Sequence, residues 1–332
     1  MDTLIWGFMK FLILDTKNPH RNLAIEEYLF SEETDDVFML WQNEPTVVIG
    51  KNQNPFAEIN LEILRERGIH IARRITGGGA VYHDLGNVNY TFISKAGEGG
   101  GLDFARFTSP IIEALASVGV AATLTGRNDL AIGGLKFSGN AQHEHGGRIL
   151  HHGTLLFDSD LDVLSSVLCV DEEKIRSKGV KSTRSRVTNL APFLPHGWSV
   201  NDFISLLSDF VIAKFSPEII KAPEDYKTEA LYKKYSSDAW LFPASGIASE
   251  HTVKKKRRYP FGGVEVLLSV KGERICNLKI TGDFFGFSDV AELESALCGA
   301  RLSEVSSIIS DFEVSNYLFG MTDKELAELI LS

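Results

Sequence analysis

Cysteine is scarce in this sequence. The 332 residues include three cysteines, Cys169, Cys276 and Cys298, and these are scattered along the second half of the chain. Their spacing is neither that of a cysteine-rich metal site nor that of a disulfide framework. A small disulfide-stabilised secreted scaffold is therefore excluded, and the pattern is typical of a protein in a reducing compartment.

An excess of positive charge is also lacking. There are 34 lysines and arginines against 44 aspartates and glutamates, so the net charge is −10. A nucleic-acid partner therefore has no global electrostatic support. The exception is the basic run at residues 254–258, which as an isolated motif could be a nuclear signal or an RNA patch; we interpret it as a solvated domain edge.

Long hydrophobic runs are absent as well. The apolar opening segment, residues 1–10, is short, carries Asp2, and leads into a strand-like stretch instead of a cleavage site. We therefore expect a cytoplasmic protein without a signal peptide or a membrane span. Because 44% of the residues are hydrophobic, a chain of this length can bury a large core, and we expect one large domain with a smaller one.

The most distinctive motif places three glycines, Gly77, Gly78 and Gly79, shortly after the pair Arg73 and Arg74. Glycine backbones adopt positive φ and let N–H groups approach a ligand closely, while guanidinium groups bind carboxylates and phosphates in a forked geometry. The motif predicts an anion site; a glycine hairpin with two solvated arginines is the alternative. No Walker-type phosphate loop is present, so any phosphates must be held differently.

Three further segments predict strands with one polar face, because polar and apolar residues alternate along them. We expect the polar positions to be Asn87, Asn89 and Thr91 in the first, Lys136, Ser138 and Asn140 in the second, and His152 and Thr154 in the third. If these faces converge, they form a pocket with one lysine and several neutral hydrogen-bonding groups. A salt-bridged core lysine is the alternative for Lys136, which we discount because its expected neighbours on the face are not acids.

Four histidines, His143, His145, His151 and His152, lie within ten positions and raise the alternative of a zinc site. No carboxylate or cysteine completes a tetrahedral set at a familiar spacing, and we expect His143 and His145 in a glycine-rich turn. We therefore favour His152 as a hydrogen-bonding residue of the pocket.

Together with residues 178–190, these motifs resemble the lipoate-protein ligase A family of the biotin/lipoate protein ligase superfamily. The order and spacing match from Asn22 to about Leu190, and again at residues 282–285. The resemblance implies an α+β fold. A catalytic lipoate- and ATP-binding domain with a class II synthetase-related mixed sheet is expected at residues 1–245, and a small α+β accessory domain at 246–332.

The resemblance also implies the chemistry. An ATP-dependent ligase would convert lipoate and ATP, with Mg²⁺, into lipoyl-AMP and pyrophosphate. It would then transfer the lipoyl group to a lysine of a lipoyl domain, in an E2 subunit of a 2-oxoacid dehydrogenase or in the glycine cleavage H protein. The adenylate is needed because a free carboxylate would have to expel oxide, whereas a mixed anhydride expels AMP.

Residue roles follow from the resemblance in the same way. Lys136 is expected to bridge the lipoate carboxyl oxygen and the α-phosphate, and Asp129 is the candidate Mg²⁺ ligand. Lys178, Ser182 and Arg184 are expected on a loop that closes over the adenylate. The residues expected to bind lipoate or the adenylate are Arg73, Gly77, Gly78, Gly79, Val81, Tyr82, Asn87, Asp129, Lys136, Ser138, Gly139, His152, Gly153 and Thr154.

Rival functions stay open at this point. An octanoyl- or lipoyl-transferase on the same fold would need a cysteine nucleophile, and Cys169 is the candidate within the catalytic half, although its apolar helical surroundings favour a buried, inert thiol. A biotin ligase is a further alternative, although its glycine loop differs. A non-catalytic binder of lipoyl-adenylate or an RNA-binding relative would not need Lys136.

Several local signals predict element boundaries. We expect a helix capped by Asn22 and running to Phe30, and another capped by Ser109 with Pro110 at its first position. Further helices are expected at residues 60–68 and 200–215, and after a capping box that begins at Thr322. Two strands, near 264–270 and 275–280, are expected in the smaller domain.

Overall fold

Apolar strands and amphipathic helices build two separate units. The computed structural model describes residues 6–97, 101–168, 187–243 and 252–332. Unit 1 comprises residues 1–48, 59–72 and 81–237, and unit 2 comprises residues 49–58, 73–80 and 238–332. Within these described ranges, no helix combines the length and the apolar character that crossing a membrane requires.

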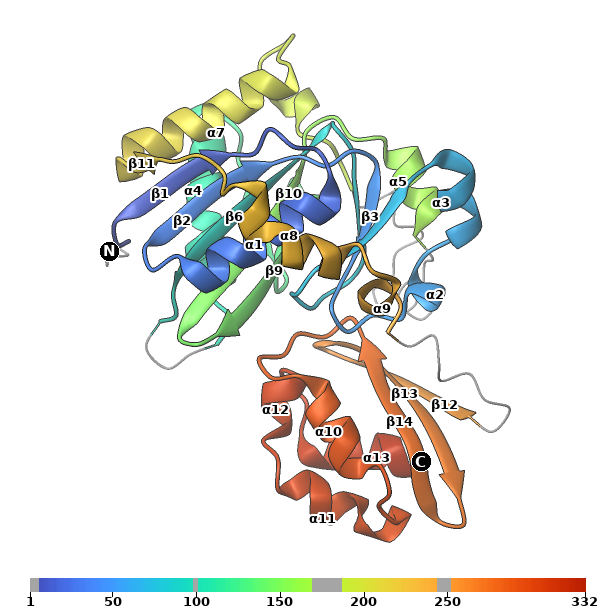
Figure 1. The fold of residues 1–332 in the computed structure, drawn as a ribbon. Coiled ribbons are helices and arrows are strands. Elements are labelled where there is room, and N and C mark those ends of the chain that lie inside the picture. Colours follow the sequence, from blue (N-terminus) through green and yellow to red (C-terminus); the bar gives the residue numbers. More distant parts are fainter. Residues whose placement is uncertain (1–5, 98–100, 169–186, 244–251) are drawn as a thin grey trace. The chain divides into compact units, whose positions relative to one another are not determined.

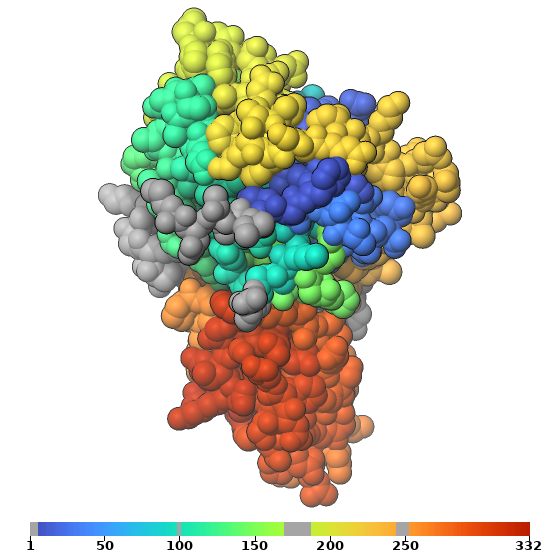
Figure 2. Space-filling model, turned by 90° about the vertical axis from the view of Figure 1, so that its left-hand side faces the viewer, coloured from blue at the N-terminus to red at the C-terminus, as the bar shows by residue number. Residues whose placement is uncertain are grey.

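A large mixed sheet forms the frame of unit 1 (Figure 1). Among the described residues it has eight strands, in the order β11-β1-β2-β6-β10-β9-β8-β7. Strand β1 pairs in parallel with β2 and β11, and the other neighbours are antiparallel. The strands are β1 (Met9–Ile13), β2 (Asp36–Trp41), β6 (Asn87–Lys95), β7 (Thr123–Thr125), β8 (Asp129–Ile132), β9 (Leu135–His145), β10 (Arg148–Leu156) and β11 (Glu218–Ile219). In Figure 2 the blue atoms of the N-terminal strand adjoin yellow atoms of the segment that leads into β11.

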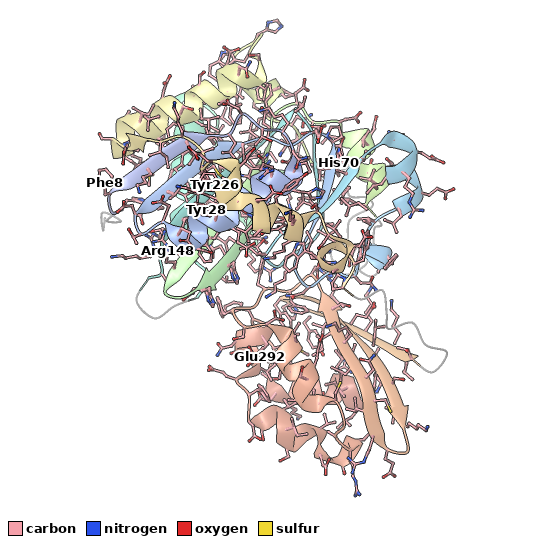
Figure 3. The ribbon with its side chains drawn as sticks, in the orientation of Figure 1. Phe8, Tyr28, His70, Arg148, Tyr226 and Glu292 are labelled. Atoms are coloured by element: carbon pink, nitrogen blue, oxygen red, sulfur yellow. The ribbon has the colours of Figure 1, made fainter. Side chains whose placement is uncertain are left out.

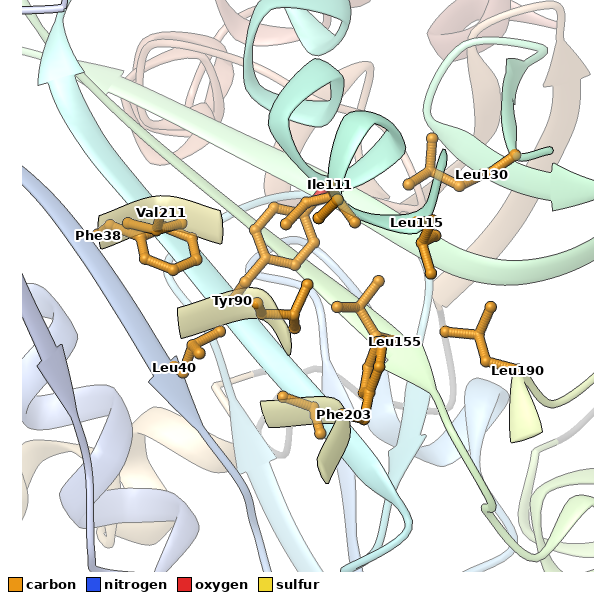
Figure 4. Close-up of a cluster of buried hydrophobic side chains, with 14 of the residues drawn as sticks. Phe38, Leu40, Tyr90, Ile111, Leu115, Leu130, Leu155, Leu190, Phe203 and Val211 are labelled. Carbon is orange, nitrogen blue, oxygen red and sulfur yellow. The ribbon is translucent and has the colours of Figure 1, made fainter. Parts of the chain in front are cut away.

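One face of this sheet, here called the core face, packs against two helices, α4 (Phe104–Ser117) and α7 (Val200–Phe215). Figure 4 shows side chains from both helices, among them Ile111 and Phe203, meeting Tyr90 and Leu155 of the sheet. Fully burying one such side chain stabilises the fold by about 1.5–3 kcal/mol. Packing on the core face therefore holds the sheet against the two helices.

The opposite face, here called the site face, lies under α1 (Pro19–Glu32), which in turn packs against α8 (Asp225–Tyr235). A second sheet has the strand order β4-β3-β5. Its strands are β3 (Thr46–Ile49), β4 (His70–Arg73) and β5 (Val81–His83). Unit 1 also contains the helices α3 (Leu61–Arg67) and α5 (Leu161–Val167) and the 3-10 turn η2 (Ala191–Phe193).

Two predicted helix starts are wrong. Helix α1 begins at Pro19 and is capped by Asn18, whose side chain accepts from the Arg21 N–H at 2.9 Å, so Asn22 lies inside the helix. Asn22 is fully buried and donates to the carbonyl of Gln42 at 2.9 Å, which is why an interior position keeps a polar residue. Both asparagines are plausible caps in sequence, and the tertiary hydrogen bond decides between them.

Helix α4 likewise begins earlier than predicted, at Phe104 with Asp103 as its cap, so Pro110 lies in its interior. Proline has no N–H and leaves the carbonyl one turn before it without its helical donor. The Ser109 hydroxyl donates to that carbonyl, of Arg106, at 3.1 Å. The Ser109 hydroxyl therefore replaces the missing proline N–H, and the helix continues through Pro110.

Unit 2 contains a three-stranded antiparallel sheet packed on helices. The strands β12 (Thr252–Tyr259), β13 (Gly262–Lys271) and β14 (Arg274–Gly282) lie in chain order, and the last two confirm the predicted strand pair. The helices are α2 (Pro55–Glu58), α9 (Asp238–Leu241), α10 (Val290–Leu297), α11 (Val305–Ser310), α12 (Val314–Tyr317), α13 (Asp323–Leu331) and the 3-10 turn η3 (Leu302–Glu304). Glu292, labelled in Figure 3, accepts a hydrogen bond from the Tyr317 hydroxyl at 2.8 Å.

The basic run forms most of β12, a strand at the edge of this sheet. Lys254 pairs with Glu265 of the neighbouring strand at 2.6 Å, and Lys255 donates to the carbonyl of Ile330 at 2.5 Å. Lysines on an edge strand hinder pairing with the edge of another protein. The run therefore has a structural place in the sheet that the sequence analysis did not predict.

Candidate active site

A buried hydrogen-bond chain lies under α1 on the site face. The Glu26 carboxylate, 1% exposed, accepts from the Thr91 hydroxyl at 2.6 Å and lies 2.9 Å from His152 Nδ1. The indole N–H of Trp41 donates to the same hydroxyl at 2.9 Å. A carboxylate so deeply buried needs partners of this kind, and it fixes the orientation of the His152 ring.

Lys136 also lies on the site face, because a β-bulge interrupts the pairing of β8 with β9. Leu130 pairs with Ser138, but its neighbour Ala131 pairs with Lys136, so one extra residue is accommodated on β9. Since partners across a ladder share a face, Lys136 and Ser138 lie on opposite faces. A Cβ added to Gly139, which neighbours Ser138, would lie 3.1 Å from Lys136 Nζ.

The predicted common face of Lys136, Ser138 and Asn140 is therefore wrong. Ser138 and Asn140 are buried on the core face, where the Asn140 amide donates to the Ser138 hydroxyl at 3.2 Å. Strict alternation cannot anticipate a bulge, because inserting one residue reverses the face of everything beyond it.

Lys136 forms an ion pair with Asp129, 2.7 Å from Nζ to Oδ1. The expectation that Lys136 lacks an acidic neighbour is thus also wrong. The two side chains are 39% and 32% exposed, however, so neither is a core residue. Pairs with this access to solvent are worth about 0–1 kcal/mol. An incoming anion can therefore compete for the ammonium group at low cost.

The remaining predicted residues of unit 1 divide between the two faces. Thr154 pairs with Asn89 on the site face, and its hydroxyl accepts from the Gly139 N–H at 3.2 Å. Gly153 belongs to the core face, where an added Cβ would lie 2.0 Å from Asn140 Oδ1. The close approach explains the glycine by packing alone.

Asn87 is fully buried at the start of β6. Its amide donates to Asn89 Oδ1 at 2.9 Å, while its own Oδ1 has no hydrogen-bond partner among the described residues. On β5, Val81 is half-buried and Tyr82 is buried, and burial raises the pKa of Tyr82 to about 12. The Tyr82 hydroxyl therefore keeps its proton at neutral pH.

Arg73 belongs to unit 2 and is 1% exposed. Its Nη1 donates to the carbonyls of Gly50, Lys51 and Gln53 at 3.0, 2.8 and 2.9 Å, and its Nη2 donates to that of Leu241 at 2.7 Å. Burial lowers the pKa of Arg73 to about 10, which leaves it charged at neutral pH. These bonds fasten two distant segments of the unit, and a contact of Arg73 with ligand stays a prediction.

Arg74, 5% exposed, shapes the glycine loop of residues 77–79. Its Nε donates to the Thr76 hydroxyl at 2.9 Å, and its Nη2 donates to the carbonyls of Gly77 and Gly79, both at 2.8 Å. The predicted alternative of two solvated arginines is therefore wrong, because both guanidinium groups are buried.

The loop packs closely within unit 2. The Gly78 N–H donates to the Phe284 carbonyl at 3.2 Å, and Gly78 has a φ of +88°. A Cβ on Gly77 would lie 2.3 Å from the same carbonyl, and one on Gly50 would lie 2.1 Å from the Gly78 carbonyl. The glycines are thus required by the protein's own packing, and their contact with an anion stays a prediction.

Sequence reasoning assigned no role to Glu26 or Trp41. A usable signal existed for Glu26, since it lies between apolar positions of α1 where a surface helix would carry an apolar residue. Its partner His152 lies 126 positions away in sequence, so the contact itself was not predictable.

Other predictions fall elsewhere. Lys178, Ser182, Arg184 and Cys169 lie outside the described residues. His143 and His145 are on β9 and not in a turn, which corrects their predicted place. In the part of the chain that the structure describes, no three His, Cys, Asp or Glu side chains form a group that could hold a metal ion.

Comparison with known proteins matches both parts of the chain. The family model of the lipoyl protein ligase A/B catalytic domain matches residues 18–211, and that of the bacterial lipoate protein ligase C-terminus matches residues 248–330. The lipoate-protein ligase LplJ of Bacillus subtilis is 39% identical over 96% of this chain and 99% of its own.

Two solved structures share the fold over 72% of this chain. A bipartite lipoate protein ligase of Thermoplasma acidophilum, described with its E2 lipoyl domain, is 29% identical with a TM-score of 0.60, covering 72% of this chain and 96% of its own. A lipoate-protein ligase A bound with ATP is 26% identical with a TM-score of 0.59, covering 72% and 99%. The predicted α+β fold, related to class II synthetases, is confirmed.

The ordered motifs of the sequence, the Lys136 site on the mixed sheet and these matches agree. The chain belongs to the lipoate-protein ligase family.

Proposed function

We propose that this protein is an ATP-dependent lipoate-protein ligase. It activates lipoate to lipoyl-AMP with release of pyrophosphate, and it then transfers the lipoyl group to a lysine of a lipoyl domain. The single observation that carries the proposal is Lys136, a half-exposed lysine that a β-bulge turns onto the site face, in a chain of this family.

Lys136 supplies positive charge where negative charge accumulates. A lipoate carboxylate oxygen attacks the α-phosphorus of ATP, the new oxygen–phosphorus bond forms, and the bond to the β-phosphate oxygen breaks. The ammonium group exchanges part of its contact with Asp129 for the carboxylate and the α-phosphate. Preorganised charge of this kind stabilises the transition state more than the ground state. In the second step the neutral amine of the carrier's lysine attacks the acyl carbon and loses a proton, the bond from that carbon to the phosphate oxygen breaks, and AMP leaves with its electron pair.

His152 and Thr154 are proposed to contact the acyl end of the substrate. His152 is 7% exposed and is held by Glu26 through Nδ1, so its ring has one orientation. A ring that is already fixed loses little entropy when the substrate binds. Lys178, Ser182 and Arg184 remain the proposed adenylate loop.

The oxygen atoms that the protein offers suit a magnesium ion whose other ligands are mainly phosphate oxygens. Mg²⁺ usually takes one or two carboxylate or carbonyl oxygens from the protein and its other ligands from phosphates and water. The Asp129 carboxylate is one-third exposed, and the Asn87 Oδ1 lacks a hydrogen-bond partner in the described structure. Asp129 is the proposed protein ligand, and the ion would neutralise charge on the departing pyrophosphate.

The proposed macromolecular partner is an unmodified lipoyl domain, in E2 subunits of 2-oxoacid dehydrogenases or in the glycine cleavage H protein. Support comes from the Thermoplasma relative, which is described with its E2 lipoyl domain. The proposed location is the cytoplasm. We also propose that residues 1–245 act as the catalytic domain and residues 246–332 as an accessory domain, with a boundary in a stretch outside the described residues.

The first experiment measures pyrophosphate release from ATP with and without lipoate, in the wild type and in Lys136→Ala, followed by addition of an unmodified lipoyl domain. The proposal predicts lipoate-dependent release, loss of release in the variant, and a mass increase of the lipoyl domain by one lipoyl group. Absence of release, with acyl transfer from a pre-acylated carrier that Cys169→Ser abolishes, would instead identify a transferase.

A further inference from the structure

Behind the strand of Lys136, on the core face, lies a second hydrogen-bond chain that has no place in the mechanism above. Asn140, 4% exposed, is at its centre. Its Oδ1 accepts from the Tyr90 hydroxyl at 2.5 Å, and its Nδ2 donates to the Asn128 carbonyl at 3.0 Å. All of these groups belong to unit 1.

Asn128 and Asn140 are clamped to each other in both directions. The Asn128 carbonyl accepts from the Asn140 backbone N–H at 2.9 Å as well as from its side chain, and the Asn128 amide donates to the Asn140 carbonyl at 2.6 Å. The next residue is Asp129, whose carboxylate holds Lys136. The two asparagines thus fix the backbone next to Asp129, which carries the carboxylate of the ion pair with Lys136.

The chain continues from Tyr90 to the start of helix α4. The Tyr90 hydroxyl lies 3.2 Å from His151 Nε2, and the Gln142 amide lies 2.8 Å from His151 Nδ1. Gln142 also exchanges two hydrogen bonds with the backbone of Asp103, the cap of α4, at 2.8 and 2.9 Å. His151 itself stacks on Phe107 of α4 with ring centroids 5.1 Å apart.

Only one arrangement of protons satisfies every group. Burial and the neighbouring His152 hold the pKa of His151 well below its ordinary value, so the ring is neutral, and burial raises the pKa of Tyr90 well above its ordinary value. Gln142 can only donate through its amide nitrogen, so His151 Nδ1 accepts and Nε2 carries the proton. His151 then donates to Tyr90, and Tyr90 donates to Asn140.

We infer that Tyr90 and Asn140 are positioning residues for adenylate formation, and that this chain, here called the Tyr90 relay, holds Asp129 and Lys136 in place from the opposite face of the sheet. The inference rests on the proposed function of Lys136. A chain in which each N–H or O–H hydrogen has its own acceptor is stiff, because no member can turn without leaving a buried group unpaired. Gly153 belongs to the same arrangement, since a side chain there would meet both Asn140 and Tyr90.

The test substitutes Tyr90→Phe, which keeps the ring and removes only the hydroxyl. We expect the kcat of lipoate-dependent pyrophosphate release to fall about tenfold, with KM for lipoate changed less than about twofold, because small misplacement affects the transition state more than binding. The matched control is Tyr235→Phe. Tyr235 is 1% exposed, belongs to the same unit and lies outside the relay. The Tyr235→Phe substitution should lower the melting temperature about as much as Tyr90→Phe does and leave kcat unchanged.

A double substitution separates positioning from general loosening. Coupled residues give non-additive effects, so Tyr90→Phe added to Asn140→Ser should lower kcat little beyond Asn140→Ser alone. Tyr235→Phe added to Asn140→Ser should leave kcat as in Asn140→Ser. Nitrogen-15 NMR of the wild type should find His151 neutral with its proton on Nε2.

The outcomes distinguish the two levels of inference. Lipoate-dependent release that Lys136→Ala abolishes but Tyr90→Phe leaves at the wild-type kcat would overturn the Tyr90 relay and keep the proposed function. Multiplicative effects of the Tyr90 and Asn140 substitutions, or a proton on His151 Nδ1, would overturn the relay as well. A wild type that releases no pyrophosphate would remove the proposed function and, with it, the positioning role.

Discussion

The cations of the glycine loop and the cation of the mixed sheet are used in different ways. Arg73 and Arg74 are 1% and 5% exposed, and their donors go mainly to backbone carbonyls of unit 2. Lys136 is 39% exposed and, among the described residues, pairs with one carboxylate, with neighbouring polar groups of the site face on its side of the sheet. Residue type alone would make all three anion binders. Their hydrogen-bond partners and their solvent exposure distinguish the structural role of the two arginines from the proposed catalytic role of Lys136.

This difference follows from physical chemistry. A guanidinium group presents several donors in a fixed plane, so one arginine can satisfy carbonyls from several segments at once. An ammonium group with a single surface-accessible acid neighbour keeps two donors for other partners. The comparison predicts that changes at the arginines affect stability first, whereas changes at Lys136 affect catalysis first.

The largest effect should come from Lys136→Ala. We expect the kcat of lipoate-dependent pyrophosphate release to fall by about 10²–10³-fold, the usual cost of removing one group that stabilises developing charge. The melting temperature should change by less than about 2 °C, because an exposed ion pair contributes little. Calorimetry and the release assay check both. A large loss of stability with little loss of kcat would make Lys136 a fastening residue like Arg73.

Arg73→Lys should have the largest effect on stability. A lysine cannot reach the four carbonyls that the guanidinium group satisfies, and buried acceptors left unpaired should cost at least about 3 kcal/mol in the free energy of unfolding. Urea denaturation gives the measurement. Arg67→Lys is the control, since Arg67 is exposed at the end of α3. Equal stability of the two variants would contradict the fastening role.

Gly77→Ala should have an intermediate effect. The new Cβ would lie 2.3 Å from the Phe284 carbonyl, a backbone atom that cannot move aside locally. Such overpacking costs typically about 1–3 kcal/mol, to be measured by urea denaturation. Gly97→Ala is the matched control, because an added Cβ there meets nothing within 4 Å. A destabilisation no greater than the control's would mean that the loop shifts freely.

The smallest effect should come from Lys51→Ala. Lys51 Nζ lies 3.1 Å from Asp289 Oδ2, with side chains 26% and 52% exposed. The loss in the free energy of unfolding should be below about 1 kcal/mol and should shrink as salt is added. Measurements at low and high salt test this. A salt-independent loss larger than that of Gly77→Ala would show that exposure is a poor guide to the cations of unit 2.

Sequence patterns predicted the parts of the fold that depend on local chemistry. The helix at 200–215, the strand pair β13 and β14, and the Thr322 capping box are confirmed, because period, turn residues and caps act within a few positions. The predicted start of α1 was wrong, because a hydrogen bond from Asn22 to the Gln42 carbonyl keeps Asn22 inside the helix and leaves Asn18 as the cap.

The candidate site was less predictable for the same physical reason. Lys136 stood out by type, but its face depends on a bulge, and the Tyr90 relay joins residues 50 and 61 positions apart. Glycines were recognised as special, yet their close neighbours, such as the Phe284 carbonyl against Gly77, come from a distant segment. Pairings of this range leave no local pattern in a single sequence.

The bulge between β8 and β9 has a consequence for how this hairpin tolerates changes in length. Residues can be added at the tip, around Gly133 and Gly134, without altering which side of the sheet receives the amine, because the tip lies beyond the paired positions. Inserting a single residue into β8 between Leu130 and Ala131 would instead give the extra residue of β9 a partner, restore strict alternation and direct the lysine into the hydrophobic interior. Added residues are therefore tolerated at the tip of this hairpin, whereas one residue added to β8 opposite the bulge would move the amine of the ligase to the wrong face of the sheet.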